Sequence, residues 1–112
     1  MTPTDRARLG DALRYAEKIR DRFAGVTREV FLANEDLQDI ALRRLEVIGN
    51  AVSKLSPKAE AAIPELDFRA IVGMRNVIAH AYDAAIDMER VWMTIERRLS
   101  ELIEELDRKL NT

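Results

Sequence analysis

The chain has 112 residues, of which 47% are hydrophobic and 34% are charged, with a formal net charge of −2 and no cysteine. This length supports one hydrophobic core, so we expect a single domain over residues 1–112. The slightly negative charge excludes a generally basic nucleic-acid-binding protein, and any contact with RNA or DNA must come from a local patch. The absence of cysteine excludes disulfide bonds, thiolate metal sites and cysteine nucleophiles.

Targeting and membrane segments are not visible in the sequence. The first residues lack the apolar core of a signal peptide. Charged residues interrupt every apolar run well before the roughly 20 residues that a membrane-spanning helix needs. We therefore expect a cytoplasmic protein with no membrane partner.

Hydrophobic residues recur every three or four positions along the chain, which is the pattern of amphipathic helices. The first predicted helix follows Pro3 and ends at Gly25, a typical C-terminal cap. Residues 27–33 form a short connector or a single helical turn. Asn34 then caps a second long helix, which ends at Ser56-Pro57.

The second half of the chain continues this helical pattern. Ser56-Pro57 opens a short segment over residues 58–63, which Pro64 ends. Asp67 caps a helix from Phe68 to about Tyr82, and Asp87 caps a final helix that runs nearly to the C-terminus. Long helices joined by short connections predict an all-α, up-and-down bundle of four main helices plus a short helix.

A charged residue interrupts the apolar stripe of the helix predicted for residues 68–82. At about 100° per residue, Arg75 lies on the same helix face as five apolar residues, and Tyr82 is nearly in line. A guanidinium cannot lose its proton, so burying it without a partner is very costly. Arg75 is therefore expected beside an anion, a polar interface or a wet cleft. The five apolar residues are Phe68, Ile71, Val72, Ile78 and Ala79.

The only histidine of the chain, His80, lies close to this arginine. Histidine titrates near neutrality and suits proton transfer, whereas the planar fork of arginine suits a phosphate. Plain structural roles are the alternatives: His80 as a histidine at a helix end, Arg75 in a salt bridge with an acidic residue of a neighbouring helix such as Glu46, and Tyr82 and Trp92 as core residues.

A metal site has little support in the sequence. Asp83 and Asp87 lie one turn apart if helical, but one histidine and no cysteine make a poor ligand set. Helix capping explains Asp87 better than metal binding does. We expect neither a metal nor another cofactor.

Three stretches carry a family resemblance: residues 45–49, residues 68–76 leading into His80-Ala81-Tyr82, and Val91-Trp92. They contain the pattern arginine, four residues, histidine, one residue, tyrosine. The chain resembles the HEPN superfamily, specifically the HepT-like ribonuclease toxins encoded beside minimal nucleotidyltransferases. Asn50 departs from the pattern, since relatives often carry an acidic residue there.

The resemblance implies metal-independent RNA cleavage, with transfer RNA as a candidate substrate. The ribose 2′-hydroxyl attacks the neighbouring phosphorus and leaves a 2′,3′-cyclic phosphate and a 5′-hydroxyl. Arg75 would stabilise the phosphorane, His80 would move a proton, and Asn76 and Tyr82 would support them. The resemblance also implies a homodimer, and a nucleotidyltransferase antitoxin that silences the toxin by adding AMP to Tyr82.

Helical geometry limits how this site is assembled. Arg75 and His80 are five residues apart, so in a regular helix they point about 140° away from each other. Either the helix loosens near residues 79–82, or a second subunit completes the site across a two-fold axis. We predict a C2 dimer in which Gly73 allows close approach. The alternative function is a noncatalytic helical dimer that serves as the binding partner or substrate-presenting subunit of a nucleotidyltransferase.

Overall fold

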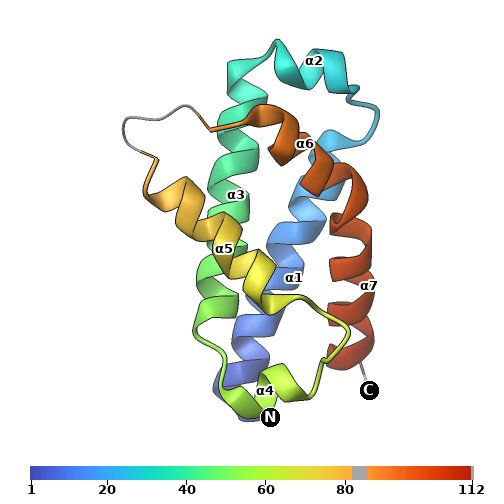
Figure 1. Cartoon of the computed structure of the whole chain (residues 1–112). Coiled ribbons are helices and arrows are strands. Elements are labelled where there is room, and N and C mark those ends of the chain that lie inside the picture. Colours follow the sequence, from blue (N-terminus) through green and yellow to red (C-terminus); the bar gives the residue numbers. More distant parts are fainter. Residues whose placement is uncertain (82–85, 112) are drawn as a thin grey trace.

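A computed structural model describes residues 1–81 and 86–111 of the chain (Figure 1). All regular secondary structure within these ranges is helical, so the predicted all-α class is confirmed. None of the described helices is long and apolar enough to cross a membrane. The helices are α1 (Pro3–Phe23), α2 (Arg28–Leu32), α3 (Glu35–Ser53), α4 (Pro57–Ala61), α5 (Phe68–Ala79), α6 (Met88–Arg97) and α7 (Leu99–Leu110).

The helices form a bundle around α1 and α3. Helix α3 packs against α1 on one side and α5 on the other, and α7 packs against α1. In Figure 1, α1, α3 and α7 follow the long direction of the molecule, while α5 crosses α3 obliquely. The largest fully buried side chains come from the first three helices, the segment after α4, and α6 and α7: Leu9, Ile19, Phe31, Ile48, Val52, Ile63, Val91 and Leu106.

The predicted helix boundaries at capping residues are confirmed. The Oδ1 atoms of Asn34, Asp67 and Asp87 accept hydrogen bonds from backbone N–H groups at the starts of α3, α5 and α6, at 3.0–3.1 Å. Gly25, two residues after the end of α1, has a φ of 80°. This conformation is unfavourable for other residues, which explains why a glycine follows the end of the helix.

Two boundaries differ from the prediction, and one open alternative is decided. The final helix is divided at Arg98, whose φ of −111° departs from regular helix geometry. The division lets α6 pack against α2 and α3 while α7 packs against α1. Residues 27–33 were expected to form either a short connector or a single helical turn, and they contain the short helix α2. Helix α5 ends at Ala79, and Tyr82 lies outside the described residues.

A buried carboxylate joins the starts of α1 and α4. Asp5 is 4% exposed, and it accepts hydrogen bonds from the Ser56 backbone N–H at 3.0 Å and the Ser56 hydroxyl at 2.7 Å. The backbone hydrogen bond, followed by the hydroxyl hydrogen bond, lowers the pKa of Asp5 to about 2 although burial acts in the opposite direction. Asp5 is therefore ionised at neutral pH and fixes the first turn of α4.

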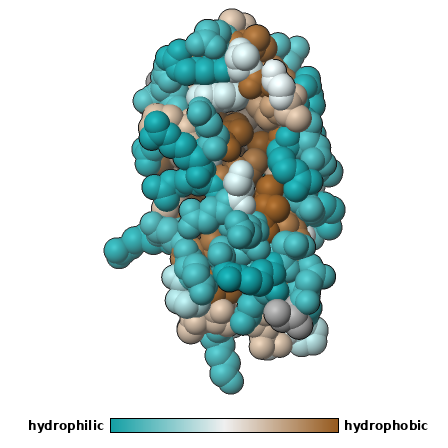
Figure 2. Space-filling model, turned by 90° about the vertical axis from the view of Figure 1, so that its right-hand side faces the viewer, coloured by the Kyte–Doolittle hydropathy of each residue, from teal (hydrophilic) through white to brown (hydrophobic). Residues whose placement is uncertain are grey.

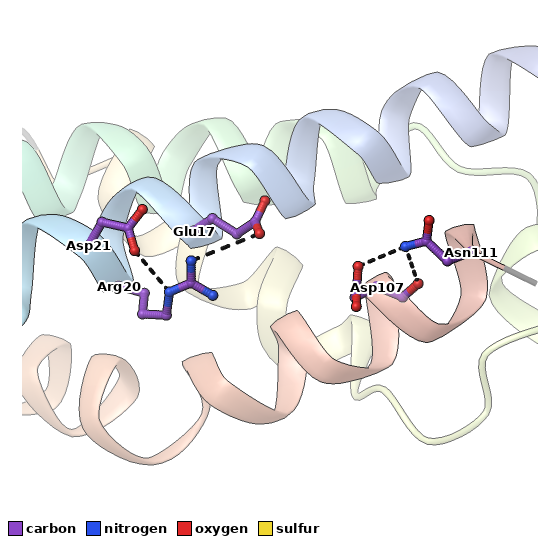
Figure 3. A network of polar contacts seen from close by, with 5 residues as sticks. All are labelled: Glu17, Arg20, Asp21, Asp107 and Asn111. Carbon is purple, nitrogen blue, oxygen red and sulfur yellow. Dashed lines mark hydrogen bonds and ion pairs between the residues drawn. The ribbon is translucent and has the colours of Figure 1, made fainter.

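The polar contacts drawn in Figure 3 are local to α1 and to α7. Arg20 lies 3.9 Å from Glu17 and 3.0 Å from Asp21. The Asn111 amide donates to the backbone and side chain of Asp107 at 2.9 and 2.7 Å. Exposed ion pairs of this kind each contribute about 1 kcal/mol or less, so the core and the caps define the fold.

Candidate active site

Helix α5, which carries the candidate site, lies at the edge of the bundle. None of its 12 residues is fully buried. The apolar stripe around Arg75 therefore packs against the core but stays partly accessible. Four of its side chains make this contact, namely Phe68, Ile71, Val72 and Ile78.

A glycine sets how closely α5 approaches α3. A Cβ atom added to Gly49 would lie 2.2 Å from the Cβ and 2.8 Å from the Cγ of Arg75. Both distances are shorter than a carbon–carbon contact allows, so α3 needs a glycine where it crosses α5. Gly73 differs, since a Cβ added there would meet nothing within 4 Å in the described chain. Its role in a dimer stays a prediction.

The guanidinium of Arg75 is held by two neutral amides. Its Nε donates to Asn50 Oδ1 on α3 at 2.5 Å, and its Nη1 donates to Asn76 Oδ1 at 2.7 Å. Within the described ranges, no carboxylate lies within 4.0 Å of it. The alternative salt bridge to Glu46 is therefore wrong, because Glu46 pairs with Arg43 at 3.5 Å.

This arrangement leaves most of the guanidinium available. An arginine head carries five N–H groups, and the two amides use only two of them. The remaining three are one N–H on Nη1 and two on Nη2. The two on Nη2 have no partner among residues 1–81 and 86–111. The full positive charge is also retained, because amide oxygens carry no formal charge. A phosphate oxygen is a fitting ligand for such a group.

His80 caps the C-terminal end of α5 and is exposed. Its backbone N–H donates to the Asn76 carbonyl at 3.1 Å, and its φ of −111° departs from the regular helix. Helix α5 thus ends at Ala79, where the range of residues 79–82 begins in which the helix was expected to loosen if one chain forms the site. The described residues nevertheless show no hydrogen bond between the Arg75 and His80 side chains. The structure joins the side chains of Arg75 and Asn76, and within the described residues the His80 side chain bonds to neither of them.

The remaining predicted residues have structural roles where the structure describes them. Trp92 is 8% exposed and its ring centroid lies 5.4 Å from that of Phe31, so its prediction as a core residue is confirmed. Asp87 caps α6, while Asp83 lies outside the described residues. Within the described ranges, no group of three or more histidine or acidic side chains could hold a metal ion.

A separate hollow of about 590 Å³ lies between α3, α5, α6 and α7. Leu45, Ile71, Met74 and Met93 contribute apolar surface, and charged residues of α6 and α7 also line it. Figure 2, which views the right-hand side of Figure 1, shows hydrophobic surface in a hollow between hydrophilic side chains. The lining does not include Arg75, Asn76 or His80. The hollow is therefore distinct from the arginine cluster, which consists of Arg75, Asn50 and Asn76.

Sequence reasoning named Gly49 and Asn50 only through the family resemblance and did not predict that they contact Arg75. Both belong to α3, 25 residues before the arginine, and their contacts depend on how two helices cross. One local signal was present, because a glycine costs stability inside a long helix and therefore points to close packing. Nothing local indicated which helix lies against it.

The fold and the cluster together define an all-helical protein that presents a cationic site suited to an anion. Residues 12–108 match the family described as Ribonuclease HepT-like. The chain therefore belongs to the HepT-like ribonuclease family, as the resemblance in the sequence indicates. At the level of the family, the activity is that of a ribonuclease.

Individual relatives cover most of the chain. The Methanocaldococcus jannaschii protein MJ1216, named as an RNase candidate, is 30% identical over 103 residues, or 92% of this chain and 84% of the relative. TTE0752 of Caldanaerobacter subterraneus, also named as an RNase candidate, is 29% identical over 99 residues and 88% of each chain. The "Probable ribonuclease HepT" of Thermococcus cleftensis is 28% identical over 94 residues and 84% of each chain.

Proposed function

We propose that this protein is a metal-independent endoribonuclease toxin and that Arg75 and His80 are its catalytic residues. The observation that carries the proposal is the guanidinium of Arg75, which neutral amides hold in place while no described carboxylate neutralises it. A fixed, uncompensated cation suits the charge that develops on phosphorane oxygens. Membership in a ribonuclease family supports RNA as the substrate.

The cleavage needs no reactant besides the RNA itself. The 2′-oxygen forms a bond to the adjacent phosphorus while a base removes its proton, and the bond from phosphorus to the 5′-oxygen breaks as that oxygen is protonated. The imidazole of His80 takes part in these proton transfers, and Arg75 binds the non-bridging oxygens. Asn76 keeps the arginine in place through its hydrogen bond to Nη1.

We further propose that a C2 homodimer completes the site. One chain supplies a single histidine, whereas the reaction benefits from both a base and an acid. Two features support the dimer: α5 has no fully buried residue, and Val77 on this helix is 42% exposed. Light scattering at micromolar concentration tests the proposal. A mass of twice 12.8 kDa agrees with it, and a monomer contradicts it.

The ribonuclease proposal is tested by incubating purified protein with an RNA mixture that includes transfer RNA, in the presence of EDTA. Wild type is compared with Arg75→Ala and His80→Ala, and the product ends are mapped. We expect cyclic-phosphate ends from the wild type and at least a hundredfold slower cleavage by either variant. Cleavage that needs added metal, or that survives both substitutions, contradicts the proposal.

Regulation by a minimal nucleotidyltransferase antitoxin is the second part of the proposal. AMP added to the Tyr82 hydroxyl would place a phosphate two residues after His80, where it competes with RNA phosphate for Arg75. The test is labelling of the protein by its cognate transferase with radioactive ATP. Tyr82→Phe should abolish labelling, and undiminished labelling contradicts this assignment.

One observation favours the alternative, a noncatalytic dimer that binds or presents substrate to a nucleotidyltransferase. The hollow of about 590 Å³ has a partly apolar lining, and Met93 in that lining is 44% exposed, as is typical of protein-binding surfaces. A folded, unmodified wild-type dimer that binds its transferase but cleaves no RNA would favour this function. Cleavage that depends on His80 excludes it.

A further inference from the structure

Positive side chains gather where α1 and α3 pack side by side (Figure 1). Four residues form this α1–α3 cationic patch: Arg14, Tyr15 and Lys18 of α1, and Arg44 of α3. The chain as a whole has a formal net charge of −2, so a polyanionic substrate needs a local surface of this kind. None of the four residues belongs to the arginine cluster on α5.

The ring of Tyr15 holds two of the cations. The Cζ atom of Arg14 lies 5.5 Å from the ring centroid, and the Nζ atom of Lys18 lies 4.8 Å from it. Tyr15 is half-buried and packs against the core, so the ring is a fixed support. A cation–π contact attracts a cation without neutralising it. Both charges therefore stay available to an anion.

Arg44 brings a third cation to the patch from the neighbouring helix. Its Nη1 donates to the backbone carbonyl of Lys18 at 3.0 Å, so the guanidinium reaches from α3 to α1. Within residues 1–81 and 86–111, the other four N–H groups of Arg44 have no partner. No described carboxylate lies within 4.0 Å of Lys18 or Arg44.

Only one of the three cations has an acidic partner in the described chain. Asp11 lies 3.1 Å from Arg14, but the two side chains are 50% and 59% exposed, so this ion pair is weak. The hollow between α3, α5, α6 and α7 differs, because acidic residues line it together with arginines. The α1–α3 cationic patch thus has the less compensated charge.

The same face of α1 continues beyond the patch in both directions. At about 100° per residue, Arg8 and Arg22 fall within about 80° of Tyr15 and Lys18 around the helix. Neither arginine has a partner within the described ranges. From position 8 to position 22, α1 rises about 21 Å. A line of positive charge therefore follows most of the helix.

We propose that the α1–α3 cationic patch binds the phosphate backbone of the RNA substrate, apart from the site at which the RNA is cut. This inference rests on the proposed ribonuclease function. Arg44 and Asn50 both belong to α3, about 9 Å apart along the helix axis and about 120° apart around it. Only an RNA of several nucleotides can therefore contact the patch and the arginine cluster together. Such phosphate contacts hold the RNA and do not read its bases.

The test variant is Lys18→Gln/Arg44→Gln, which removes two charges from the patch. The matched control is Arg20→Gln/Arg108→Gln, which removes two exposed charges from α1 and α7. Arg20 lies about 160° from Lys18 around α1, so the control leaves the patch intact. Circular dichroism compares the folding and Tm of both proteins with those of the wild type.

Binding is measured by fluorescence anisotropy on a long 2′-O-methyl oligonucleotide, which the enzyme cannot cleave. The patch variant should bind about tenfold more weakly than the wild type, and the control should bind like the wild type. The slope of log affinity against log salt should become shallower by about 1.4, as expected for two lost phosphate contacts on a single strand. Equal affinities in the patch variant and the control would overturn the inference.

Cleavage kinetics distinguish a binding role from a structural one. With a long RNA, KM should rise about tenfold in the patch variant while kcat is unchanged, because the patch binds substrate and transition state equally. With a short RNA that spans only the cleavage site, both constants should match the wild type. A structural defect would instead lower kcat on both substrates, and that result contradicts the inference.

The single variant Lys18→Gln covers the case in which the double variant does not fold. It keeps the hydrogen bond of Arg44, which uses the backbone carbonyl of Lys18. Its affinity for the long oligonucleotide should fall about threefold, with a salt slope shallower by about 0.7. An unchanged affinity and slope would count against the patch as an RNA-binding surface.

The outcomes separate this inference from the proposed function. A wild type that binds and cleaves RNA, with a folded patch variant that does so equally well, overturns the inference and leaves the ribonuclease function intact. The same result is expected if the patch serves an acidic protein surface instead of RNA. A wild type that neither binds nor cleaves RNA overturns both. Weaker binding in the patch variant alone supports both.

Discussion

The substitution Gly49→Ala tests the close approach of α3 and α5 that positions Arg75. In most helix interiors, replacing glycine by alanine stabilises the protein by about 1 kcal/mol. At this position the new Cβ would lie 2.2 Å from the Cβ of Arg75, whereas carbon atoms pack at about 3.5–4.0 Å. The neighbouring atom belongs to the rigid base of the side chain, so the helices themselves must separate by roughly 1.3 Å or more.

The energetic balance for Gly49→Ala follows from these distances. Overpacking of this kind costs about 1–3 kcal/mol, which offsets or exceeds the gain in helix propensity. Gly10→Ala in α1 is the matched control, because a Cβ there meets nothing within 4 Å. It should gain the full propensity term. The two variants should therefore differ by about 1–3 kcal/mol in the free energy of unfolding.

Thermal denaturation followed by circular dichroism measures this difference. One kcal/mol corresponds to about 4 °C in Tm for a chain of this length, so Gly49→Ala should melt roughly 4–12 °C below Gly10→Ala. RNA cleavage should also fall by up to about a hundredfold, since a shift of about 1 Å misplaces Arg75. A Gly49→Ala protein that is stabilised as much as Gly10→Ala would refute the close contact.

Three further predictions follow from the structure. Asp5→Asn should lower Tm at pH 7 and make the decrease of Tm at acid pH less steep. The reason is that the charged Asp5 contributes stability above its ordinary pKa of 3.8 and loses that contribution as the pH falls towards its folded-state pKa of about 2. A pH profile of Tm that matches the wild type contradicts this. Gly73→Ala should stabilise the isolated fold by about 1 kcal/mol, since nothing within the described chain obstructs a Cβ there. The same substitution should weaken the dimer if α5 approaches the α5 of the second subunit at Gly73, and sedimentation equilibrium distinguishes the two effects. Arg75→Lys should keep RNA affinity within a fewfold of the wild type but lower kcat at least a hundredfold. An ammonium lacks the planar fork of arginine and the Nε–H that Asn50 accepts. A wild-type kcat in this variant would exclude a requirement for an oriented guanidinium.

Local chemistry explains why the helix starts could be predicted from the sequence. Asn34, Asp67 and Asp87 each cap the helix that the sequence assigned to them, because a side-chain oxygen satisfies backbone N–H groups only a few residues away. The division at Arg98 could not be predicted in this way. No glycine or proline marks it, and the backbone hydrogen bonds from Arg98 to Thr94 and from Leu102 to Arg98 are kept across it.

The site shows a similar contrast. The apolar periodicity of α5 identified the helix face on which Arg75 lies, but periodicity does not indicate how completely a face is covered. The structure leaves that face half-buried, so the arginine needs no buried counter-charge. The contact with Asn50 joins residues 25 positions apart, and it depends on the crossing of α3 and α5 at Gly49. Pattern reasoning along one helix has no access to such a contact.

The central claim is that Arg75 and His80 promote attack by the ribose 2′-hydroxyl. The most direct test uses an RNA whose cleavage site has been mapped, together with the same RNA carrying a single 2′-deoxy nucleotide on the 5′ side of that site. Both are incubated with wild type and with His80→Ala in EDTA. The account predicts cleavage only of the unmodified RNA by the wild type, with a 2′,3′-cyclic phosphate end. Cleavage of the deoxy-substituted RNA at the same site by the wild type would contradict it.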